Sequence, residues 1–187
     1  TTYYGGSSGP LFDDAIAMSK KTMKSAKKAA KRGNAEAQYK LGVCYALGKG
    51  VGQCKETAVW YLTKSAAQGL AEAQFTLGHC YMSGAGVDAC AKTAVGFFEK
   101  SAAQGFAKAQ CRLGFCYEYG VGVDACAKTA FEFYEKSAAQ GFATAQCNLG
   151  LCYMDGDGVD VCLKTAAKLF AKAEAQGVSE AKVTLRE

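Results

Sequence analysis

The chain is 187 residues long, half of its residues are hydrophobic, and its formal net charge is +5. This composition supplies enough apolar side chains for a substantial core and excludes a disordered chain. One proline and 22 glycines favour helices joined by glycine turns over a β-sandwich. No run reaches the roughly 20 apolar residues that cross a bilayer and no signal peptide is visible, so we expect a soluble mature chain.

The first 34 residues precede the regular part of the chain. Residues 1–10 are rich in glycine and serine, which indicates a flexible leader. Residues 11–34 are predicted to form a capping helix, and the stretch 13–32 holds seven basic and two acidic residues, which accounts for the whole net charge. Such a helix can contact an acidic protein surface or anionic lipid, or be a plain solvated face. Nucleic acid is not expected, because the stretch has no aromatic residue for stacking.

A 36-residue repeat follows and decides the architecture. The tetrapeptide Ala-x-Ala-Gln at 35–38 returns at 71–74, 107–110 and 143–146, and in a degraded form at 179–182. In each unit, apolar residues at helical spacing predict a first helix (helix A), and after a Gly-x-Gly-Val loop a second stripe predicts helix B. Each hairpin has one apolar face, so neighbours must stack. We predict an all-α array of four repeats, at 35–70, 71–106, 107–142 and 143–178, and a C-terminal capping helix at 179–187.

Glycines and aspartates are expected to mark the helix ends. Gly48 is predicted to end helix A of the first repeat, and Gly69 its helix B. Asp88, Asp124 and Asp160 are predicted N-caps of helix B in the second, third and fourth repeats, and a glycine takes that place in the first.

The repeat pattern Ala-x-Ala-Gln-x-x-Leu-Gly-x-x-Tyr-x-x-Gly-x-Gly-Val, seen from Ala35 to Val51 and three more times, resembles that of Sel1-like repeats, which are relatives of the tetratricopeptide repeat. The resemblance implies a right-handed α-solenoid that serves as a scaffold or adaptor. The cysteines are the departure from the common pattern, and they make the chain similar to a cysteine-rich branch of the family.

Four cysteine pairs recur with nine residues between their members. The first cysteine falls in the last turn of helix A and the second in the first turn of helix B, and antiparallel packing brings these ends together. We therefore expect one disulfide in each repeat, stabilising by about 2–3 kcal/mol. Zinc ligation and free thiols are the alternatives, although each repeat offers only two sulfurs and the chain has one histidine. The expected pairs are Cys44 with Cys54, Cys80 with Cys90, Cys116 with Cys126, and Cys152 with Cys162.

This density of cysteines argues for an oxidising compartment. The sequence does not choose between the secreted space, endoplasmic reticulum lumen, periplasm, mitochondrial intermembrane space and thylakoid lumen. Two further cysteines, Cys111 and Cys147, take a helix A position that holds an aromatic residue in the first two repeats. We expect them to be small buried residues. The alternative is that Cys111, Cys147 or His79 holds haem or metal in an assembly chaperone.

A partner-binding stripe is predicted on helix A, where four positions spaced i, i+4, i+7 and i+11 vary between repeats. The resemblance puts this face on the concave side of the solenoid. Two aromatics beside two basic residues in the third repeat have the composition of a binding hot spot, whereas unconstrained solvent-facing residues are the alternative. The candidate contacts are Lys40, Val43, Leu47, Thr76, His79, Lys108, Arg112, Phe115, Tyr119, Asn148, Leu151 and Asp155.

No set of catalytic residues can be assembled with confidence from the sequence. Ser25 and Lys28 match the S-x-x-K pattern of β-lactam-recognising hydrolases, but the companion motifs are missing. We therefore expect no enzyme, cofactor or metal, and predict a non-catalytic scaffold or structural subunit of a larger complex. The haem- or metal-handling chaperone is the alternative, and the hydrolase a remote one.

Overall fold

The computed structural model describes residues 20–178, and side chains from residue 22 onward. This described part contains nine α-helices and no strand. The chain forms two compact units, residues 1–89 and 90–187, and each is described by itself. The leader predicted at 1–10, the start of the capping helix at 11–19, and the capping helix predicted at 179–187 lie outside the described residues. Between residues 20 and 178, no helix is long and apolar enough to cross a membrane.

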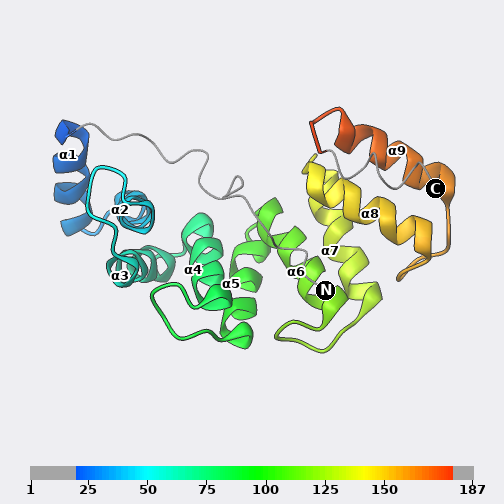
Figure 1. The fold of residues 1–187 in the computed structure, drawn as a ribbon, viewed down its shortest axis with the longest axis horizontal. Helices are drawn as coiled ribbons and strands as arrows, with labels where there is room; N and C mark the ends of the chain where they lie inside the picture. Colours follow the sequence, from blue (N-terminus) through cyan, green and yellow to red (C-terminus); the bar gives the residue numbers. More distant parts are fainter. Residues whose placement is uncertain (1–19, 179–187) are drawn as a thin grey trace. The chain divides into compact units, whose positions relative to one another are not determined.

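The first unit contains α1 (Lys20–Lys31), α2 (Ala35–Leu47), α3 (Lys55–Ala67) and α4 (Ala71–Ser83). Each helix packs against the one before it in the sequence, from α1 to α4 (Figure 1). The basic α1 buries Met23 and Ala30 in a core shared with Leu41 of α2. It therefore covers the apolar face at the start of the repeats, as a capping helix should.

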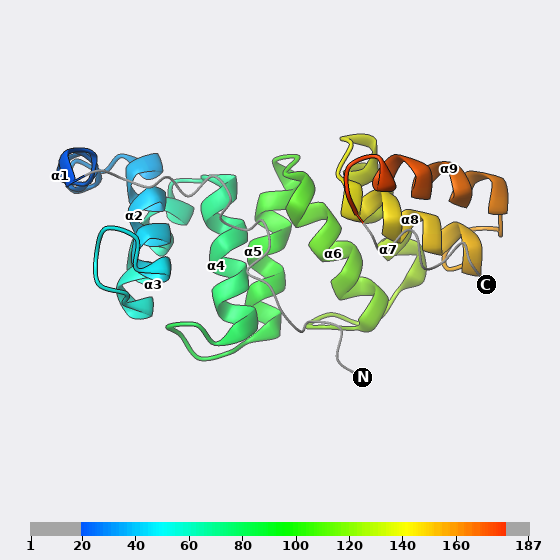
Figure 2. The same cartoon turned by 45° about the horizontal axis from the view of Figure 1, so that its top comes forward.

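The second unit contains α5 (Ala91–Ala103), α6 (Ala107–Tyr119), α7 (Ala127–Ala139), α8 (Ala143–Asp155) and α9 (Leu163–Glu174). Consecutive helices again pack in order, and α8 and α9 form the last hairpin (Figure 2). Helix A of the four repeats is α2, α4, α6 and α8, and helix B is α3, α5, α7 and α9. The predicted fold of helix-turn-helix repeats in a solenoid-like order is thus confirmed within each unit.

In the first, third and fourth repeats, the glycine of the Leu-Gly pair lets the two helices of the hairpin approach closely. A Cβ on Gly42 would lie 2.8 Å from Leu62 Cγ, and one on Gly150 would lie 2.7 Å from Phe170 Cε1. A side chain of helix B therefore occupies the space above each of these glycines. Any larger residue there would have to displace a fully buried neighbour.

Polar side chains fasten the helix ends in the same way from repeat to repeat. Ser65 Oγ at the end of α3 donates to the Ala35 carbonyl at the start of α2 (2.7 Å). Gln68 Nε2 donates to Gln38 Oε1 (2.7 Å), and Gln38 Nε2 in turn donates to the Ala30 carbonyl of α1 (3.1 Å). These bonds satisfy buried polar atoms and explain why serine and glutamine recur with the repeat.

The loops contain glycines in the left-handed conformation, as predicted. Gly48 ends α2 with φ +70°, and its N–H donates to the Cys44 carbonyl. Gly86 approaches the preceding helix B so closely that a Cβ would lie 2.5 Å from the Lys55 carbonyl. The Gly-x-Gly loop of one repeat thereby packs on the start of helix B in the repeat before it.

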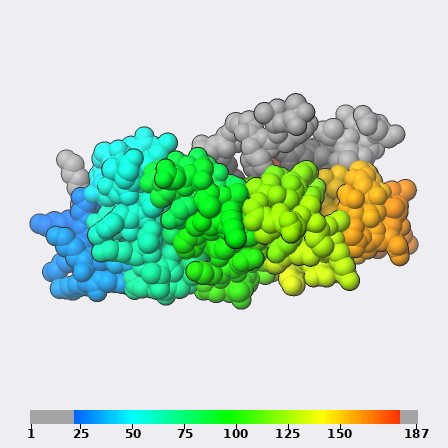
Figure 3. All heavy atoms as spheres, turned by 90° about the horizontal axis from the view of Figure 1, so that it is seen from below, coloured from blue at the N-terminus to red at the C-terminus, as the bar shows by residue number. Residues whose placement is uncertain are grey.

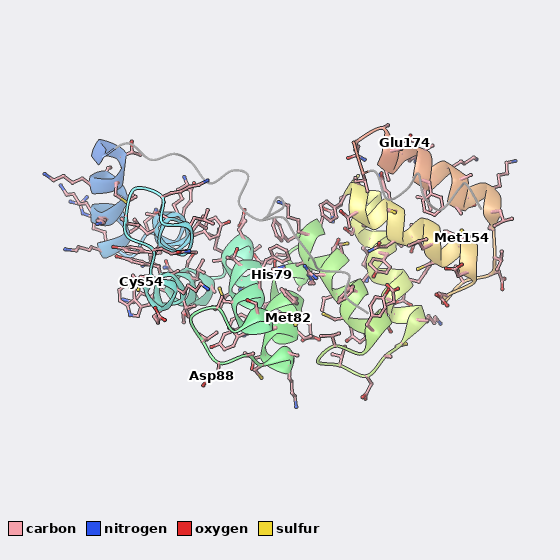
Figure 4. All side chains as sticks on the ribbon, in the orientation of Figure 1. Cys54, His79, Met82, Asp88, Met154 and Glu174 are labelled. Atoms are coloured by element: carbon pink, nitrogen blue, oxygen red, sulfur yellow. The ribbon has the colours of Figure 1, made fainter. Side chains whose placement is uncertain are left out.

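The predicted aspartate N-caps are wrong. Cysteines Cys54, Cys90, Cys126 and Cys162 are the N-caps of the four B helices, with extended or near-extended backbones and no capping bond from the side chain. Asp88 lies in the loop after α4 (Figure 4), two residues before the N-cap. The helices begin later than expected because backbone bonds hold the cysteines against the end of helix A: the Cys126 N–H donates to the Tyr117 carbonyl (2.8 Å).

Candidate interaction surface and cysteine pairs

The helix A stripe of the first unit is only partly available to a partner. Val43 is 4% exposed and Thr76 is 2% exposed, so these two predicted contacts are wrong. Thr76 Oγ1 instead donates to the Glu72 carbonyl (2.8 Å). Lys40 is half-buried and bonds Glu36 at 2.6 Å, and Leu47 is also half-buried. Here the stripe offers a paired charge and little apolar surface.

His79 lies on α4 (Figure 4) and is half-buried. Its ring meets that of Phe75 edge to face, with 4.6 Å between centroids. Ser83 Oγ donates to the His79 carbonyl (2.8 Å). The predicted contact His79 is therefore packed on an aromatic neighbour and only partly exposed, with its Nε2 atom buried.

In the second unit, the stripe of α6 forms a continuous aromatic and basic surface. The Arg112 guanidinium lies 5.6 Å from the centre of the Phe115 ring, and the Phe115 and Tyr119 rings are 4.7 Å apart. Tyr119 is 62% exposed, an unusual value for a large aromatic residue. Lys108 begins the same stripe and is half-buried. The structure thus brings together the four residues that the sequence singled out in this repeat.

The stripe of α8 is more polar. Asn148 Nδ2 lies 3.9 Å from Cys111 Sγ of α6. This contact links the helix A faces of the third and fourth repeats. Leu151 is half-buried and Asp155 is exposed. This repeat offers no aromatic residue on its stripe.

The sequence analysis missed a second surface, in the first unit, where α1, α2 and α3 meet. Lys27 Nζ lies 6.0 Å from the centre of the Tyr45 ring. Tyr45 stacks on Tyr61 at 5.7 Å, and Tyr61 meets Trp60 edge to face at 4.8 Å. Lys64 Nζ lies over the Trp60 ring at 3.8 Å. We call these five residues the lysine–aromatic surface.

A signal for this surface was present in the sequence. The positions that align with Trp60 in the later repeats hold Gly96, Glu132 and Lys168, so the tryptophan has no role in the repeated packing. Lys64, in contrast, aligns with a lysine in every repeat. Variation between repeats at this helix B position therefore indicates Trp60, just as variation on helix A indicates the partner-binding stripe.

The backbone brings the expected cysteine partners to neighbouring positions in three repeats. The Cys54 N–H donates to the carbonyl of Tyr45, the residue after Cys44, at 3.0 Å. Equivalent bonds of 2.8 Å place Cys126 and Cys162 beside the ends of α6 and α8. Cys80 and Cys90 fall in different units. The structure contains all ten cysteines as separate thiols, so the four disulfides stay a prediction.

The two members of a pair have different thiol chemistry. Burial raises the pKa of Cys116 to about 11 and that of Cys152 to about 12. Among the N-cap thiols, Cys90 and Cys126 are exposed and Cys162 is half-buried, and a hydrogen bond with a threonine one turn on lowers the pKa of these three. Thr129 Oγ1, for example, donates to Cys126 Sγ at 3.2 Å. The exposed member is therefore the more reactive thiolate of its pair.

Cys111 and Cys147 are buried, as predicted. Burial is also the main reason that the pKa of Cys111 is raised to about 12. A protonated, buried thiol is a poor ligand for haem or metal. In the described part of the chain, no three histidine, cysteine or acidic side chains come together as metal ligands would.

Ser25 and Lys28, the two residues of the hydrolase pattern, line one shallow recess with Arg32 and Asn34. The recess lies along the C-terminal half of α1. The recess also borders the start of α2, whose N-cap is Asn34, and it places basic side chains beside Ser25.

Comparison with known proteins agrees with this architecture. The sequence pattern of the Sel1 repeat family matches four times, at residues 35–70, 71–106, 107–142 and 143–178, which together make up most of the chain. No curated protein matches the sequence.

Several solved structures are similar. A protective antigen of uropathogenic Escherichia coli with an SLR fold is 33% identical (TM-score 0.82), and the match covers 86% of this chain and 34% of the antigen. A Sel1 repeat protein from Oxalobacter formigenes is 32% identical (TM-score 0.81), over 89% of this chain and 48% of that one. Cysteine rich protein B of Helicobacter pylori, 21% identical with a TM-score of 0.55, shares the fold over 71% of this chain and 95% of its own. The chain thus spans about a third and about half of the first two relatives.

Proposed function

Because the chain belongs to the Sel1 repeat family, we propose that it is a non-catalytic scaffold that binds a protein partner through the helix A stripe of its second unit. Proteins built from Sel1 repeats generally mediate protein–protein interactions and are generally not catalysts. The finer proposal is that this chain is a scaffold or structural subunit within a larger complex.

The observation that carries the proposal is the run of Arg112, Phe115 and Tyr119 on α6. The two rings are in contact, a guanidinium lies beside one of them, and Tyr119 is largely exposed. Arginine and tyrosine are the residue types most enriched among those that dominate binding energy. Since their mutual contacts already restrict these side chains, a partner loses less conformational freedom on docking.

Crosslinking and pull-down from native extract test the proposal, with the double variant Phe115→Ala/Tyr119→Ala compared with the wild type. The matched control is Val161→Ala/Leu163→Ala, two exposed apolar residues of the second unit that lie outside the helix A stripe. The aromatic variant should lose at least about tenfold in capture of the partner, because truncating a hot-spot residue costs about 2 kcal/mol or more. Equal capture by both variants and wild type would refute the assignment of this surface.

For the compartment, we propose an oxidising one in which each repeat closes its own disulfide. The regular spacing of the four pairs supports this, together with the backbone bonds that bring Cys54, Cys126 and Cys162 beside the ends of the preceding helices. Peptide mapping without reduction, on protein from its native source, tests the pairing. Bridged peptides that join Cys44 to Cys54 and Cys116 to Cys126 are expected; fully alkylated cysteines would contradict the compartment as well as the bonds.

A further inference from the structure

From the arrangement of α1 and α3, we infer that the lysine–aromatic surface of the first unit binds an acidic segment of a protein partner. The surface comprises Lys27, Tyr45, Tyr61, Trp60 and Lys64. It belongs to the other unit from the Arg112–Phe115–Tyr119 stripe, so it is a second binding surface, and the two proposals can fail separately.

The charge of α1 is the first argument. The sequence from residue 20 to residue 33 contains seven basic residues and no acidic one. Met23 and Ala30 are buried against α2, whereas Lys24, Lys28 and Lys31 of the same helix are exposed. In the space-filling view, α1 (blue) lies directly against the first repeat (cyan) (Figure 3).

The chain of ring contacts is the second argument, because it joins this charge to α3. Lys27 lies beside Tyr45, and Tyr45 stacks on Tyr61. Tyr61 in turn meets Trp60 edge to face, and Lys64 lies over the Trp60 ring. The ring contacts hold both ammonium groups in place while leaving their N–H donors able to bind an oxygen outside. Two restrained cations on either side of an aromatic patch suit carboxylates spaced along a peptide.

Trp60 is the third argument. It is 52% exposed, and the aligned glycine, glutamate and lysine of later repeats show that the fold does not need a tryptophan there. An exposed tryptophan is the side chain that gains most from an apolar contact with a partner. The expected ligand therefore combines acidic residues with at least one apolar side chain.

Acidic residues of this unit leave the surface positive. Glu56 lies one turn before Trp60 on α3, and it accepts a hydrogen bond from Cys54 Sγ at 3.4 Å. Glu36 is paired with Lys40 at 2.6 Å. Glu56 is thus the one carboxylate named near Trp60, and it is outnumbered by Lys64 and the lysines of α1. This face therefore keeps an excess of positive charge.

The geometry favours an acidic protein segment over single-stranded nucleic acid. Nucleic acids bind such surfaces by stacking bases on open aromatic faces. Here Tyr45 and Tyr61 cover each other with an interplanar angle of 12°, and Lys64 lies over a face of Trp60. The cations, rather than free ring faces, are what the surface offers.

Trp60 provides the experiment, because it is the only tryptophan in the sequence and its fluorescence reports on this surface without a label. The full chain is titrated with a synthetic peptide of 12 residues in which glutamates alternate with leucines. The same peptide with every glutamate replaced by glutamine is the control ligand. Oligothymidylate and vesicles containing phosphatidylserine represent the other polyanions. The acidic peptide should shift the Trp60 emission and bind most tightly, with an affinity that falls as salt rises.

The double variant Lys27→Gln/Lys64→Gln should bind the acidic peptide about fivefold more weakly, a magnitude typical of two exposed charge pairs. Lys100→Gln/Lys136→Gln is the matched control, since these lysines also lie over phenylalanine rings, at 5.3 Å each, and should leave the affinity unchanged. Equal weakening by both variants, equal affinity for the glutamine peptide, or tighter binding of the oligonucleotide or the vesicles would overturn the inference. The affinity of the Phe115→Ala/Tyr119→Ala variant should stay at the wild-type value, which separates this test from that of the proposed function.

Discussion

Replacing Gly114 by alanine should destabilise the second unit, although alanine is the better helix former. Gly114 lies within α6, and a Cβ there would be 2.5 Å from Cε1 and 2.6 Å from Cδ1 of Tyr134. Ordinary contact requires at least about 3.4 Å, so the ring would have to move by about 1 Å. Tyr134 is fully buried and its hydroxyl is bonded to Glu118, which leaves the ring little room to move.

Two opposing terms set the magnitude. Alanine gains about 1 kcal/mol over glycine inside a helix. Overpacking a rigid buried site costs about 1–3 kcal/mol, and a shift of a whole ring belongs at the upper end of that range. The free energy of unfolding should therefore fall by about 1–2 kcal/mol, or Tm by about 2–8 °C for a chain of this size.

Gly96 provides the matched control, because it also lies inside a helix of the second unit, α5, and a Cβ there would meet nothing within 4 Å. Gly96→Ala should therefore stabilise by about 1 kcal/mol. Both variants are compared with wild type by urea and thermal unfolding followed by far-UV circular dichroism, in reducing buffer so that disulfides do not contribute. The reasoning is refuted if Gly114→Ala is as stable as wild type, or if both glycine replacements change stability in the same direction.

Three further predictions concern buried and exposed polar groups of the same unit. Tyr134→Phe removes a hydroxyl that donates to Glu118, so it should lower the free energy of unfolding by about 1 kcal/mol. The same urea assay measures this change, and a variant as stable as wild type would contradict a stabilising role of the hydrogen bond. Burial raises the pKa of Cys116 to about 11, above the value of about 8.5 for an unfolded thiol, so its stabilisation is complete below about pH 8.5 and is lost as pH rises toward 11. Unfolding titrations in reducing buffer should show a steeper loss for wild type than for Cys116→Ala over that interval, and parallel curves would refute the shift. Reduced Cys126 should react with iodoacetamide at least about tenfold faster than Cys116. Thr129→Val removes the hydrogen bond that lowers the Cys126 pKa, so it should slow the reaction of Cys126. Mass spectrometry of the peptides measures both rates.

The internal repeat made most of the fold predictable from the sequence. A single chain with four copies provides its own comparison, and positions such as Leu41 and Gly42 stay constant because each copy must fit the next. Gly48, which was predicted to end the first helix A, is its C-cap. Periodicity could not reveal which constant polar residues bond each other, because the Gln68–Gln38 contact joins residues 30 positions apart.

The start of helix B shows why local preference failed. Aspartate is a better N-cap than cysteine in isolation, which favoured Asp124 over Cys126. The deciding interaction is the backbone bond from Cys126 to Tyr117, which keeps the chain extended until after the cysteine. This bond depends on how the hairpin closes, and no preference of single residues for helix ends contains it.

Variation between repeats also proved an incomplete guide to exposure. Val43 and Thr76 were assigned to the partner-binding stripe because their columns vary, yet both are buried. The column of Val43 holds histidine, phenylalanine and leucine in the other repeats, and that of Thr76 holds lysine, arginine and asparagine, so burial at these positions depends on the side chain that each repeat carries. In the third repeat Phe115 is half-buried and Tyr119 remains at the surface, so this part of the stripe stays a predicted contact.

Residues that break the repeat are of two physical kinds, and burial separates them. Tyr134 replaces an apolar residue of the core, and Glu118, which aligns with alanine or methionine in the other repeats, accepts its hydroxyl hydrogen bond. This paired change satisfies a buried polar group and concerns stability. Trp60 and Tyr119 break the repeat at the surface, where no packing requirement selects a large aromatic side chain. Surface departures of this second kind are where a scaffold built from near-identical units can acquire different partners, one for each unit of this chain.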